Sequence, residues 1–308
     1  MVEVKKHVVV YSSDIHGNEI QYQKLVNYAL QISADSVIVG GDIAPKGDSV
    51  TVYLKKLKEL SPDLFIAMQR FFFEKRLPDL VRPLKEKGID LFLMMGNDDC
   101  AANYGLFEKG EEEGLYKIIH EKRLRLTDDF DIVGYSYVPI TPFGIKDWEK
   151  FDLSDASSAL NQDYDKRKRS NYNLVGSKSS KEGWSDFEFT SDMEKTDSIQ
   201  KDMSSELFQQ DPHKTVYVMH APPNDTNLDI IINGNHVGSF AEKLFIQQCQ
   251  PYLTLHGHIH ETVYKSGTFK QVIGNTLSLA SGNHNVGKDL AVVVFDLYDI
   301  GRVRRIII

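Results

Sequence analysis

Cysteine is scarce in this chain of 308 residues, which contains only Cys100 and Cys249. Two cysteines cannot form the framework of bridges on which small secreted domains depend, so a reducing compartment is expected. The sequence also shows no signal-peptide core near its start and no apolar run long enough to cross a membrane. We therefore expect a cytoplasmic protein that has no membrane partner.

Positive charge is also in deficit. Lys and Arg total 36 against 44 Asp and Glu, which gives a formal net charge of -8. A nucleic-acid-binding protein usually presents a basic face, so this balance argues against nucleic acid as a partner or substrate. Hydrophobic residues at 41% and charged residues at 26% are typical of globular proteins. The length suits one large α/β domain or two small ones.

Five apolar runs in the sequence each end in a short polar loop that contains Gly or Pro. The runs are residues 8–12, 36–39, 91–95, 215–219 and 252–255. They are rich in β-branched, aromatic and other apolar residues, which is typical of strands buried on both faces. Helical periodicity lies between several of them. This alternation predicts βαβ units, in which ligands bind at the carboxyl ends of the strands.

The remaining elements are predicted from prolines that begin helices and from shorter hydrophobic patterns. A long helical stretch is expected between residues 50 and 88, where Pro62 would begin a second helix and Pro78 a third. Near the end of the chain the sequence predicts an antiparallel meander. Its strands would be residues 262–264, 269–273, 277–279, 291–296 and 303–308.

Residues 146–211 differ in character from the rest of the chain. Ser, Asp and Lys dominate there, and no strand or helix pattern is sustained. A loop of this length inside a compact domain is usually a lid or a disordered insertion. Trp148 and Trp184 favour a partly ordered lid, whereas the basic run 166–169 is expected to be a solvated surface. Deletion of residues 155–202 is therefore expected to leave the fold stable and to change substrate preference.

The loops that follow the five runs carry side chains suited to binding metal ions. They are Asp14 and His16, Asp42, Asn97, His220, and His258 with His260. Gly257 frees the last pair from strand alternation, so both imidazoles can point into one site. Metal binding requires neutral imidazole and ionised carboxylate. This mixed nitrogen and oxygen set suits Mn, Fe, Zn or Ni better than Ca or Mg.

The motifs DxH, GGD, GND, HAPP and GHIH, which span Asp14 to His260, together resemble the calcineurin-like metallophosphoesterases. The resemblance implies an α/β fold, a four-layer αββα sandwich of two mixed sheets with flanking helices. It would be a single domain over residues 1–308 with an insertion at about 146–211. The resemblance also implies two divalent metal ions, with manganese preferred and iron, zinc or nickel also suitable. The first metal would be held by Asp14, His16, Asp42 and His260, and the second by Asp42, Asn97, His220 and His258.

The chemistry expected from this resemblance is hydrolysis of a phosphoester. Two cations about 3.5 to 4 Å apart clamp a phosphate and generate a bridging hydroxide that attacks phosphorus. Asp14 and Asp42 oppose the positive charge of the cations, and the hydroxide and a diester monoanion bring the loaded site close to neutral. A monoester dianion would leave excess negative charge unless a Lys or Arg helped, so this balance favours a small phosphodiester, such as a cyclic nucleotide. Asn97 is also expected to contact the substrate.

One position departs from the family pattern. Many members have a catalytic histidine where this chain has Asp98. An aspartate beside two cations stays ionised and is a poor general acid, so we expect Asp98 to orient a water or a histidine. His236, His256 and His284 are candidates for a substitute proton donor, although each alone is more often a structural histidine.

Other functions stay open at this point. A phosphomonoesterase or a nuclease would use the same fold, and the acidic balance opposes the nuclease. A catalytically weak scaffold that binds a protein partner is an alternative of another class. The missing histidine favours it, and the full ligand set opposes it. A zinc hydrolase of amide bonds is opposed by Asn97, an uncharged oxygen ligand.

Overall fold

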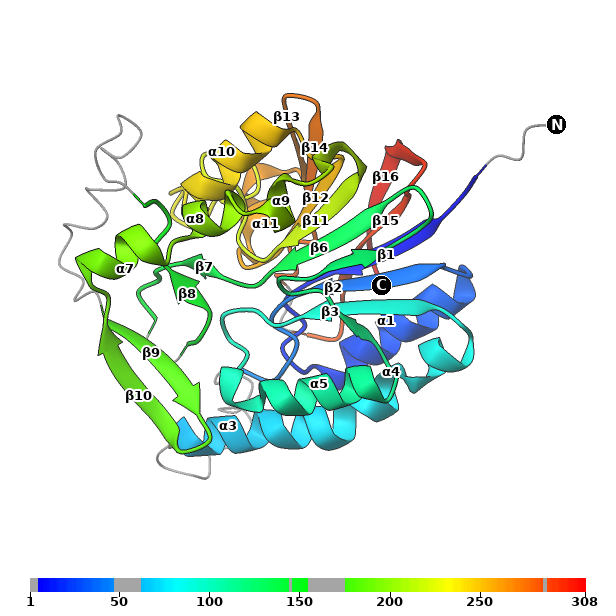
Figure 1. Ribbon diagram of the computed structural model, residues 1–308. Helices are drawn as coiled ribbons and strands as arrows, with labels where there is room; N and C mark the ends of the chain where they lie inside the picture. The colour runs from blue at the N-terminus through cyan, green and yellow to red at the C-terminus, as the bar shows by residue number, and fades with distance from the viewer. Residues whose placement is uncertain (1–4, 47–61, 144–145, 155–174, 285–286) are drawn as a thin grey trace.

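The computed structural model describes residues 5–46, 62–143, 146–154, 175–284 and 287–308 (Figure 1). Its first large sheet has six strands in the order β16-β15-β1-β2-β3-β4. The strands are β1 (Val8–Ser12), β2 (Ser36–Gly40), β3 (Asp90–Met94), β4 (Lys117–Ile118), β15 (Ala291–Asp296) and β16 (Asp299–Ile307). β1 to β4 run parallel, and β15 and β16 add an antiparallel edge beside β1.

The second large sheet also has six strands, in the order β13-β14-β12-β11-β6-β5. The strands are β5 (Arg123–Arg125), β6 (Asp131–Tyr135), β11 (Thr215–Met219), β12 (Leu253–His256), β13 (Lys270–Ile273) and β14 (Thr276–Ala280). The four central strands are parallel, and both edge strands are antiparallel to their neighbours. The five predicted apolar runs are the central strands β1, β2, β3, β11 and β12, as their continuous hydrophobicity indicated.

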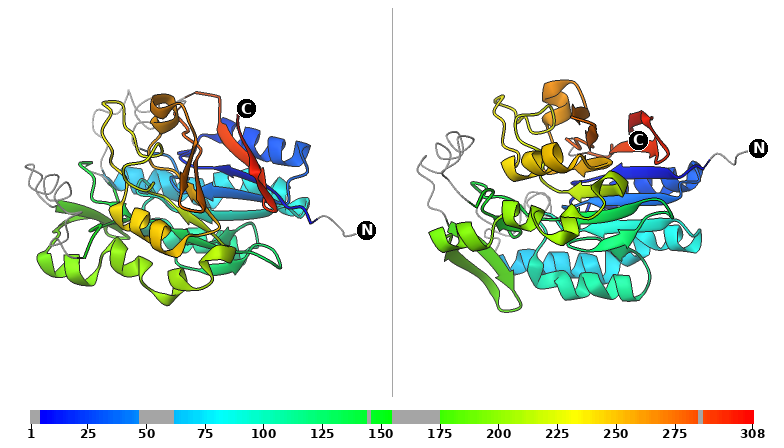
Figure 2. Two further views of the ribbon diagram at one scale, coloured as in Figure 1. Left: turned by 90° about the horizontal axis from the view of Figure 1, so that it is seen from above. Right: turned by 45° about the horizontal axis from the view of Figure 1, so that its top comes forward.

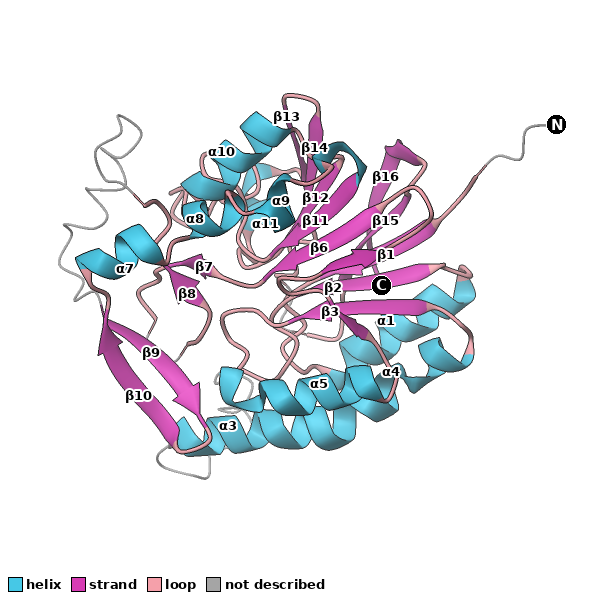
Figure 3. Ribbon diagram, viewed as in Figure 1, coloured by secondary structure: helices cyan, strands magenta, loops and turns pink. Residues whose placement is uncertain are grey.

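The two sheets pack face to face, and helices cover both outer faces (Figures 2 and 3). Side chains such as Val9 and Ile38 from one sheet and Val218 and Leu255 from the other form the buried layer between them. The first sheet is covered by α1 (Glu19–Gln31), α4 (Leu77–Glu86) and α5 (Tyr104–Glu112). The second is covered by α8 (Ile199–Met203), α9 (Glu206–Gln209) and α10 (Phe240–Cys249). The αββα sandwich implied by the resemblance is confirmed.

The helices before β3 begin at or next to the predicted prolines but follow one another without a break. Helix α3 (Pro62–Phe71) begins at Pro62, as expected, but it continues through a π-helical turn, η1 (Phe72–Arg76), directly into α4. Pro78 lies in the first turn of α4, as predicted, although no break separates α4 from the helical residues before it. The π-helical turn ends just before this proline, which lacks the N–H that an α-helical ladder uses.

The predicted terminal meander is wrong in two respects. Residues 262–264 lie in a helix, α11 (Thr262–Ser266), which ends at Gly267 with φ of 74°. The buried Thr262 hydroxyl donates to the Asn227 carbonyl, so this first residue of α11 joins the helix to the loop that carries Asn227. In addition, the hairpin of β13 and β14 and the hairpin of β15 and β16 belong to different sheets. Local hairpin signals did not specify which sheet each hairpin joins.

The described parts of residues 146–211 contain strands and helices that no sustained sequence pattern had indicated. The strand β8 (Glu149–Lys150) pairs with β7 (Val138–Pro139), and β9 (Val175–Ser180) forms a hairpin with β10 (Gly183–Glu188). The helices α7 (Ser191–Thr196), α8 and α9 follow. Ile199 and Phe208 are buried in the core beneath the second sheet. The basic run 166–169 lies outside the described residues.

None of the described helices combines the length and the apolar character needed to cross a membrane.

Candidate metal centre

The loops after β1, β2 and β12 adopt left-handed backbone conformations at residues that are not glycine. Asp14, His16, Asp42 and His258 have φ values of 57°, 48°, 52° and 65°. Such conformations are uncommon for these residue types, cost on the order of 1–3 kcal/mol each and cluster at functional sites. Backbone bonds join two of the loops, since His16 N–H donates to the Asp42 carbonyl at 2.8 Å. Because the left-handed residues turn the chain sharply within these loops, their side chains can converge.

A first group of four side chains meets at this edge of the sheets. The ligand atoms of Asp14, His16, Asp42 and His260 all lie within 4.8 Å of one another. His16 Nε2 lies 3.1 Å from His260 Nε2, and His260 Nε2 lies 3.5 Å from Asp14 Oδ1. Two imidazole nitrogens and two carboxylates at these distances are a donor set that suits a divalent transition metal.

A second group shares Asp42 with the first. Asp42 Oδ2 lies 3.3 Å from His220 Nε2 and 3.9 Å from His16 Nε2, so one carboxylate oxygen faces both groups. Asn97 Oδ1 lies 3.2 Å from His220 Nε2. The ring of His258 lies 5.4 Å from the ring of His220, measured between centroids. The structure therefore brings all seven predicted side chains together.

In the first group the pKa shifts of the two histidines are opposite, because burial lowers that of His16 whereas Asp14 outweighs burial at His260 and raises its pKa. Burial opposes ionisation of Asp14, but the neighbouring His260 holds the pKa of that carboxyl well below its usual range. Burial lowers the pKa of His16 to about 3, which leaves its imidazole neutral. Neutral imidazole and ionised carboxylate are the forms that coordinate metals.

The second group likewise combines a histidine whose pKa is lowered with one whose pKa is raised. Burial lowers the pKa of His258 to about 3. Burial also acts against protonation of His220, but the Asp42 carboxylate outweighs it and raises the His220 pKa to about 10. Asp42 in turn has its pKa lowered, since His220 outweighs the effect of burial. A cation that binds here must displace the proton that His220 and Asp42 share.

Neighbouring groups orient these ligands. His220 Nδ1 lies 2.8 Å from the Gly40 carbonyl, which leaves Nε2 directed at Asp42. A Cβ on Gly96 would lie 2.4 Å from Asp42 Oδ1 and 2.7 Å from His220 Nε2. The glycine of the GND motif is therefore required by the close approach of the backbone to the site.

Asp98 lies beside the two groups. Its backbone N–H donates to Asp42 Oδ1 at 2.9 Å, and its Oδ2 lies 3.8 Å from His16 Nδ1. Its Oδ1 accepts a hydrogen bond from the Asn97 side-chain amide at 3.1 Å. Burial raises the pKa of Asp98 to about 7, and the charge of Asp42 adds to this rise.

Asp99 is a supporting residue that the sequence did not single out. Its carboxylate is fully buried and accepts hydrogen bonds from the backbone N–H groups of Ile43, Ala44 and Gly96, at 3.0, 2.8 and 2.8 Å. It thereby joins the loop that carries Asp42 to the loop that carries Asn97. The only signal in the sequence was a second acidic residue in the GND loop.

Two further supporting residues come from distant parts of the chain. Asp147 accepts a hydrogen bond from the Ala101 N–H at 2.9 Å and donates its own N–H to the Asn97 carbonyl at 2.9 Å. The Asn283 amide donates to the Asp14 carbonyl at 3.1 Å. Neither residue belongs to a motif, so no sequence pattern pointed to them.

The three candidate proton donors lie in different surroundings. His256 is fully buried, with Nδ1 2.8 Å from the Ala221 carbonyl and Nε2 2.8 Å from Thr254 Oγ1. Both of its nitrogens are occupied, so it is structural. His236 pairs with Asp229 at 2.6 Å. His284 is exposed and stacks on Tyr264 with ring centroids 5.7 Å apart.

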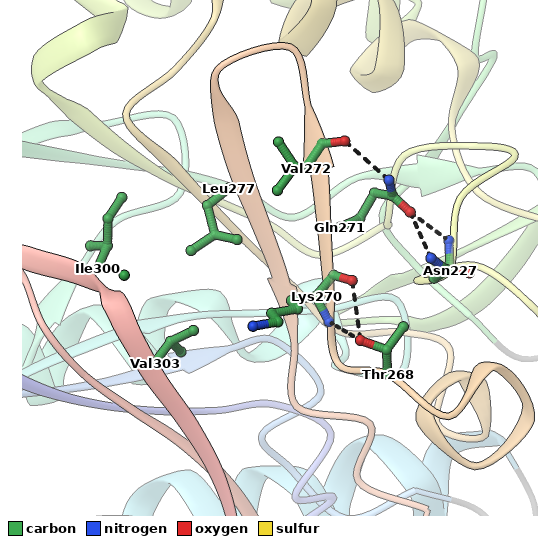
Figure 4. A pocket seen from close by; sticks show the side chains of 9 residues that line it. Asn227, Thr268, Lys270, Gln271, Val272, Leu277, Ile300 and Val303 are labelled. Carbon is green, nitrogen blue, oxygen red and sulfur yellow. Dashed lines mark hydrogen bonds between the residues drawn. The ribbon is translucent and has the colours of Figure 1, made fainter.

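A cavity of about 340 Å³ lies elsewhere in the sandwich, between the β13–β14 hairpin and β16 (Figure 4). Its walls include Lys270, Val272, Leu277, Ile300 and Val303. Within the described chain, none of the seven candidate ligands lines this cavity. The seven candidate ligands therefore lie apart from this cavity.

Comparison with protein families supports this geometry. A family model described as calcineurin-like phosphoesterase matches residues 7–262, a range that includes all seven side chains. The chain belongs to this family. As a calcineurin-like phosphoesterase, it is a phosphoester hydrolase by class and carries a candidate cluster for a divalent metal. Comparison with curated protein sequences finds no match.

Solved structures resemble this calcineurin-like phosphoesterase in fold at low sequence identity. One crystal structure aligns with a TM-score of 0.58 at 14% identity, covering 98% of this chain and 99% of the other. A protein of Thermus thermophilus aligns with a TM-score of 0.51 at 12% identity and 98% coverage of both chains. A dimetal phosphatase from Danio rerio aligns with a TM-score of 0.49 at 12% identity, also with 98% coverage of both chains.

Proposed function

We propose that this calcineurin-like phosphoesterase is a two-metal phosphodiesterase that hydrolyses a small phosphodiester. The observation that carries the proposal is the position of Asp42, whose Oδ2 faces His16 at 3.9 Å and His220 at 3.3 Å. A carboxylate in this place is suited to bridge two cations. We assign Asp14, His16, Asp42 and His260 to the first metal, and Asp42, Asn97, His220 and His258 to the second.

The donor set fits this assignment. Asp14 and Asp42 are buried carboxylates that face histidines and also repel each other, so cations would balance their charge. Imidazole nitrogen combined with carboxylate and amide oxygen suits manganese, which we propose as the resident metal. When bound, two such cations supply Lewis acidity and lower the pKa of a bound water.

We assign further roles to Asn97 and Asp98. Asn97, held beside His220, is placed to orient a phosphoryl oxygen. Asp98 would orient a water or His16, because its carboxylate lies 3.8 Å from the His16 ring. A diester monoanion brings one negative charge to a centre that already holds two buried carboxylates, and a monoester dianion brings a second. This charge balance supports a diester as the substrate.

The test is hydrolysis of bis(4-nitrophenyl) phosphate by the full chain with added manganese, compared with the His220→Ala variant. We expect the variant to lose activity by about 100-fold or more, since it lacks one of the proposed ligands. His213→Ala, an exposed histidine outside the site, is the matched control and should keep wild-type activity. Background rates for the wild type and His220→Ala alike would refute the proposal and favour a scaffold that binds a protein partner.

Other substrates distinguish the alternative activities that this fold could support. Faster hydrolysis of 4-nitrophenyl phosphate than of the diester would identify a monoesterase, and cleavage of single-stranded DNA would identify a nuclease. We also propose that residues 146–211 shape access to the phosphate as an insertion in a single domain over residues 1–308. The cytoplasm stays the predicted compartment, consistent with free thiols at Cys100 and Cys249.

A further inference from the structure

Two consecutive residues from the start of the insertion, Asp147 and Trp148, bind the loop that carries Asn97. The backbone N–H of Asp147 donates to the Asn97 carbonyl at 2.9 Å. The indole N–H of Trp148 donates to the Asp99 carbonyl at 2.8 Å. These two hydrogen bonds lie on either side of Asp98 in the sequence, so the insertion fixes the backbone of the GND loop at two points.

The side chain of Asp147 joins the next residues of this loop to strand β9. Its Oδ2 accepts a hydrogen bond from the Ala101 N–H at 2.9 Å, and its Oδ1 accepts one from the Ser179 N–H at 3.0 Å. The Ser179 hydroxyl donates to the same carboxylate and accepts from the Ala102 N–H at 2.9 Å. Asp147 and Ser179 are both buried. Strand β9 therefore belongs to the same hydrogen-bonded network as the GND loop.

Trp148 holds a strained backbone conformation. Its φ is 58°, in the left-handed region that bulky residues avoid. Its carbonyl accepts a hydrogen bond from the Val138 N–H at 2.9 Å. Its indole packs against the rings of Tyr104, His120 and Tyr137. Strain of this kind persists only where the surrounding contacts enforce it, and it clusters at functional sites.

We propose that Asp147 and Trp148 are positioning residues, which hold Asn97 in the orientation that lets its side-chain oxygen bind the second metal. This inference rests on the proposed two-metal function. Asn97 is buried, and its Oδ1 lies 3.2 Å from His220 Nε2. A neutral amide oxygen attracts a cation less strongly than a carboxylate does, so its contribution depends more on how firmly neighbouring groups hold it. The insertion thereby completes the metal centre.

The competing role for these residues is a contribution to folding alone. In that case, loss of either residue's hydrogen bonds would lower the melting temperature and leave the affinity for both metals unchanged. Positioning instead predicts a selective effect. The second metal, which Asn97 would bind, is weakened, and the first metal, which Asn97 does not bind, is unaffected.

The experiment uses the full chain and compares wild type with Trp148→Phe, Asp147→Asn and Asn97→Ala. It also includes the double variant that combines Trp148→Phe with Asn97→Ala. Trp148→Phe removes the indole N–H and keeps an aromatic ring. Tyr252→Phe is the matched control, since it removes a hydrogen bond of 2.7 Å from another half-buried aromatic side chain to a backbone carbonyl, that of Leu297.

Three readouts separate positioning from folding. Titration calorimetry of the metal-free protein gives the affinity of each manganese-binding step. Thermal melting without metal identifies any loss of folding. Amide hydrogen exchange of residues 96–101, also without metal, measures how firmly the GND loop is held.

We expect Trp148→Phe and Asp147→Asn each to weaken the second manganese step about 10-fold and to leave the first step unchanged. Amide exchange of residues 96–101 should be faster in both variants than in Tyr252→Phe. The double variant should bind the second manganese no more weakly than Asn97→Ala alone, because the indole acts through Asn97.

Three results would overturn the inference. The first is that both single variants match Tyr252→Phe in both manganese steps. The second is faster amide exchange with no change in manganese affinity, which would limit the two residues to a role in folding. The third is an additive loss of affinity in the double variant. A wild type that bound no second manganese would instead refute the proposed two-metal function, and this inference with it.

Discussion

The Nε2 atoms of His16 and His260 lie 3.1 Å apart, although 244 positions separate the two residues in the chain. Two imidazoles at this distance either share one proton or direct both lone pairs at a cation. Burial keeps His16 neutral, and Asp14 lies 3.5 Å from His260 on the other side. The pair therefore links the loop after β1 to the loop after β12 through two candidate metal-binding side chains.

Manganese should stabilise the folded protein. A ligand that binds only the native state at 100 times its Kd adds about 3 kcal/mol to the free energy of unfolding. We expect the melting temperature to rise with manganese and to return to the lower value with a chelator, measured by scanning calorimetry. His260→Gln should show a smaller rise, whereas the exposed His213→Ala should match wild type. Identical melting of the wild type with manganese and with chelator would contradict this expectation.

Replacement of Asp42 by Asn should reduce the occupancy of both metal positions. Asp42 Oδ2 faces both histidine groups, and an amide is a weaker ligand than a carboxylate and carries no charge to balance two cations. Elemental analysis after dialysis measures the metal content per chain. Asp192→Asn, an exposed carboxylate on α7, is the control and should leave the content unchanged. Loss of only one metal in Asp42→Asn would show that this residue does not bridge.

Residues near the end of the 146–211 stretch should matter for stability. Ile199 is fully buried in the core cluster beneath the second sheet, together with Phe208. We expect Ile199→Ala to lower the free energy of unfolding by about 2–5 kcal/mol, measured by urea denaturation. Lys195→Ala, exposed on α7, should change it by less than about 0.5 kcal/mol.

The same burial changes the expectation for a deletion in this region. Removal of residues 155–202 would take away most of α8, so we now expect it to destabilise the fold. If the Ile199→Ala protein were as stable as the Lys195→Ala protein, the segment would instead be a separable lid.

His120 should make stability fall in acid. It is buried, its Nδ1 accepts a hydrogen bond from the Ser136 N–H at 3.1 Å, and burial lowers its pKa from 6.5 to about 3. The unfolded chain therefore binds the proton more readily than the folded chain. The effect is absent above pH 6.5, grows as the pH falls toward 3, and reaches about 2 kcal/mol at pH 5.

A comparison of urea denaturation at pH 7 and pH 5 isolates this effect. His120→Asn keeps an acceptor for the Ser136 N–H and cannot be protonated in this range. We expect the variant to lose about 2 kcal/mol less than wild type between the two pH values. His213→Ala should show the full wild-type loss, and an equal loss in His120→Asn would rule out His120 as the source.

Local sequence patterns predicted much of the architecture, and the incorrect predictions also concern short segments. Strands β1, β2, β3, β11 and β12 are buried on both faces, so their continuous apolar runs identified them directly. Residues 262–264 were predicted as a strand because they contain a β-branched pair. That pair did not reveal that Thr262 is the first residue of a helix. Helices α7 to α9 were missed because each is short and polar on its outer face, and its stability comes from packing.

The amino-acid sequence by itself determined the family, the layered fold and the seven side chains at strand ends, because parallel strands and the glycine turns after them are encoded within a few residues. Only the tertiary structure decided how those side chains meet and what surrounds them. The Asp99 carboxylate bridging two loops and the Asn283 amide on Asp14 depend on contacts between distant segments. Such contacts form only when the two sheets pack, since no short-range pattern specifies which loops become neighbours.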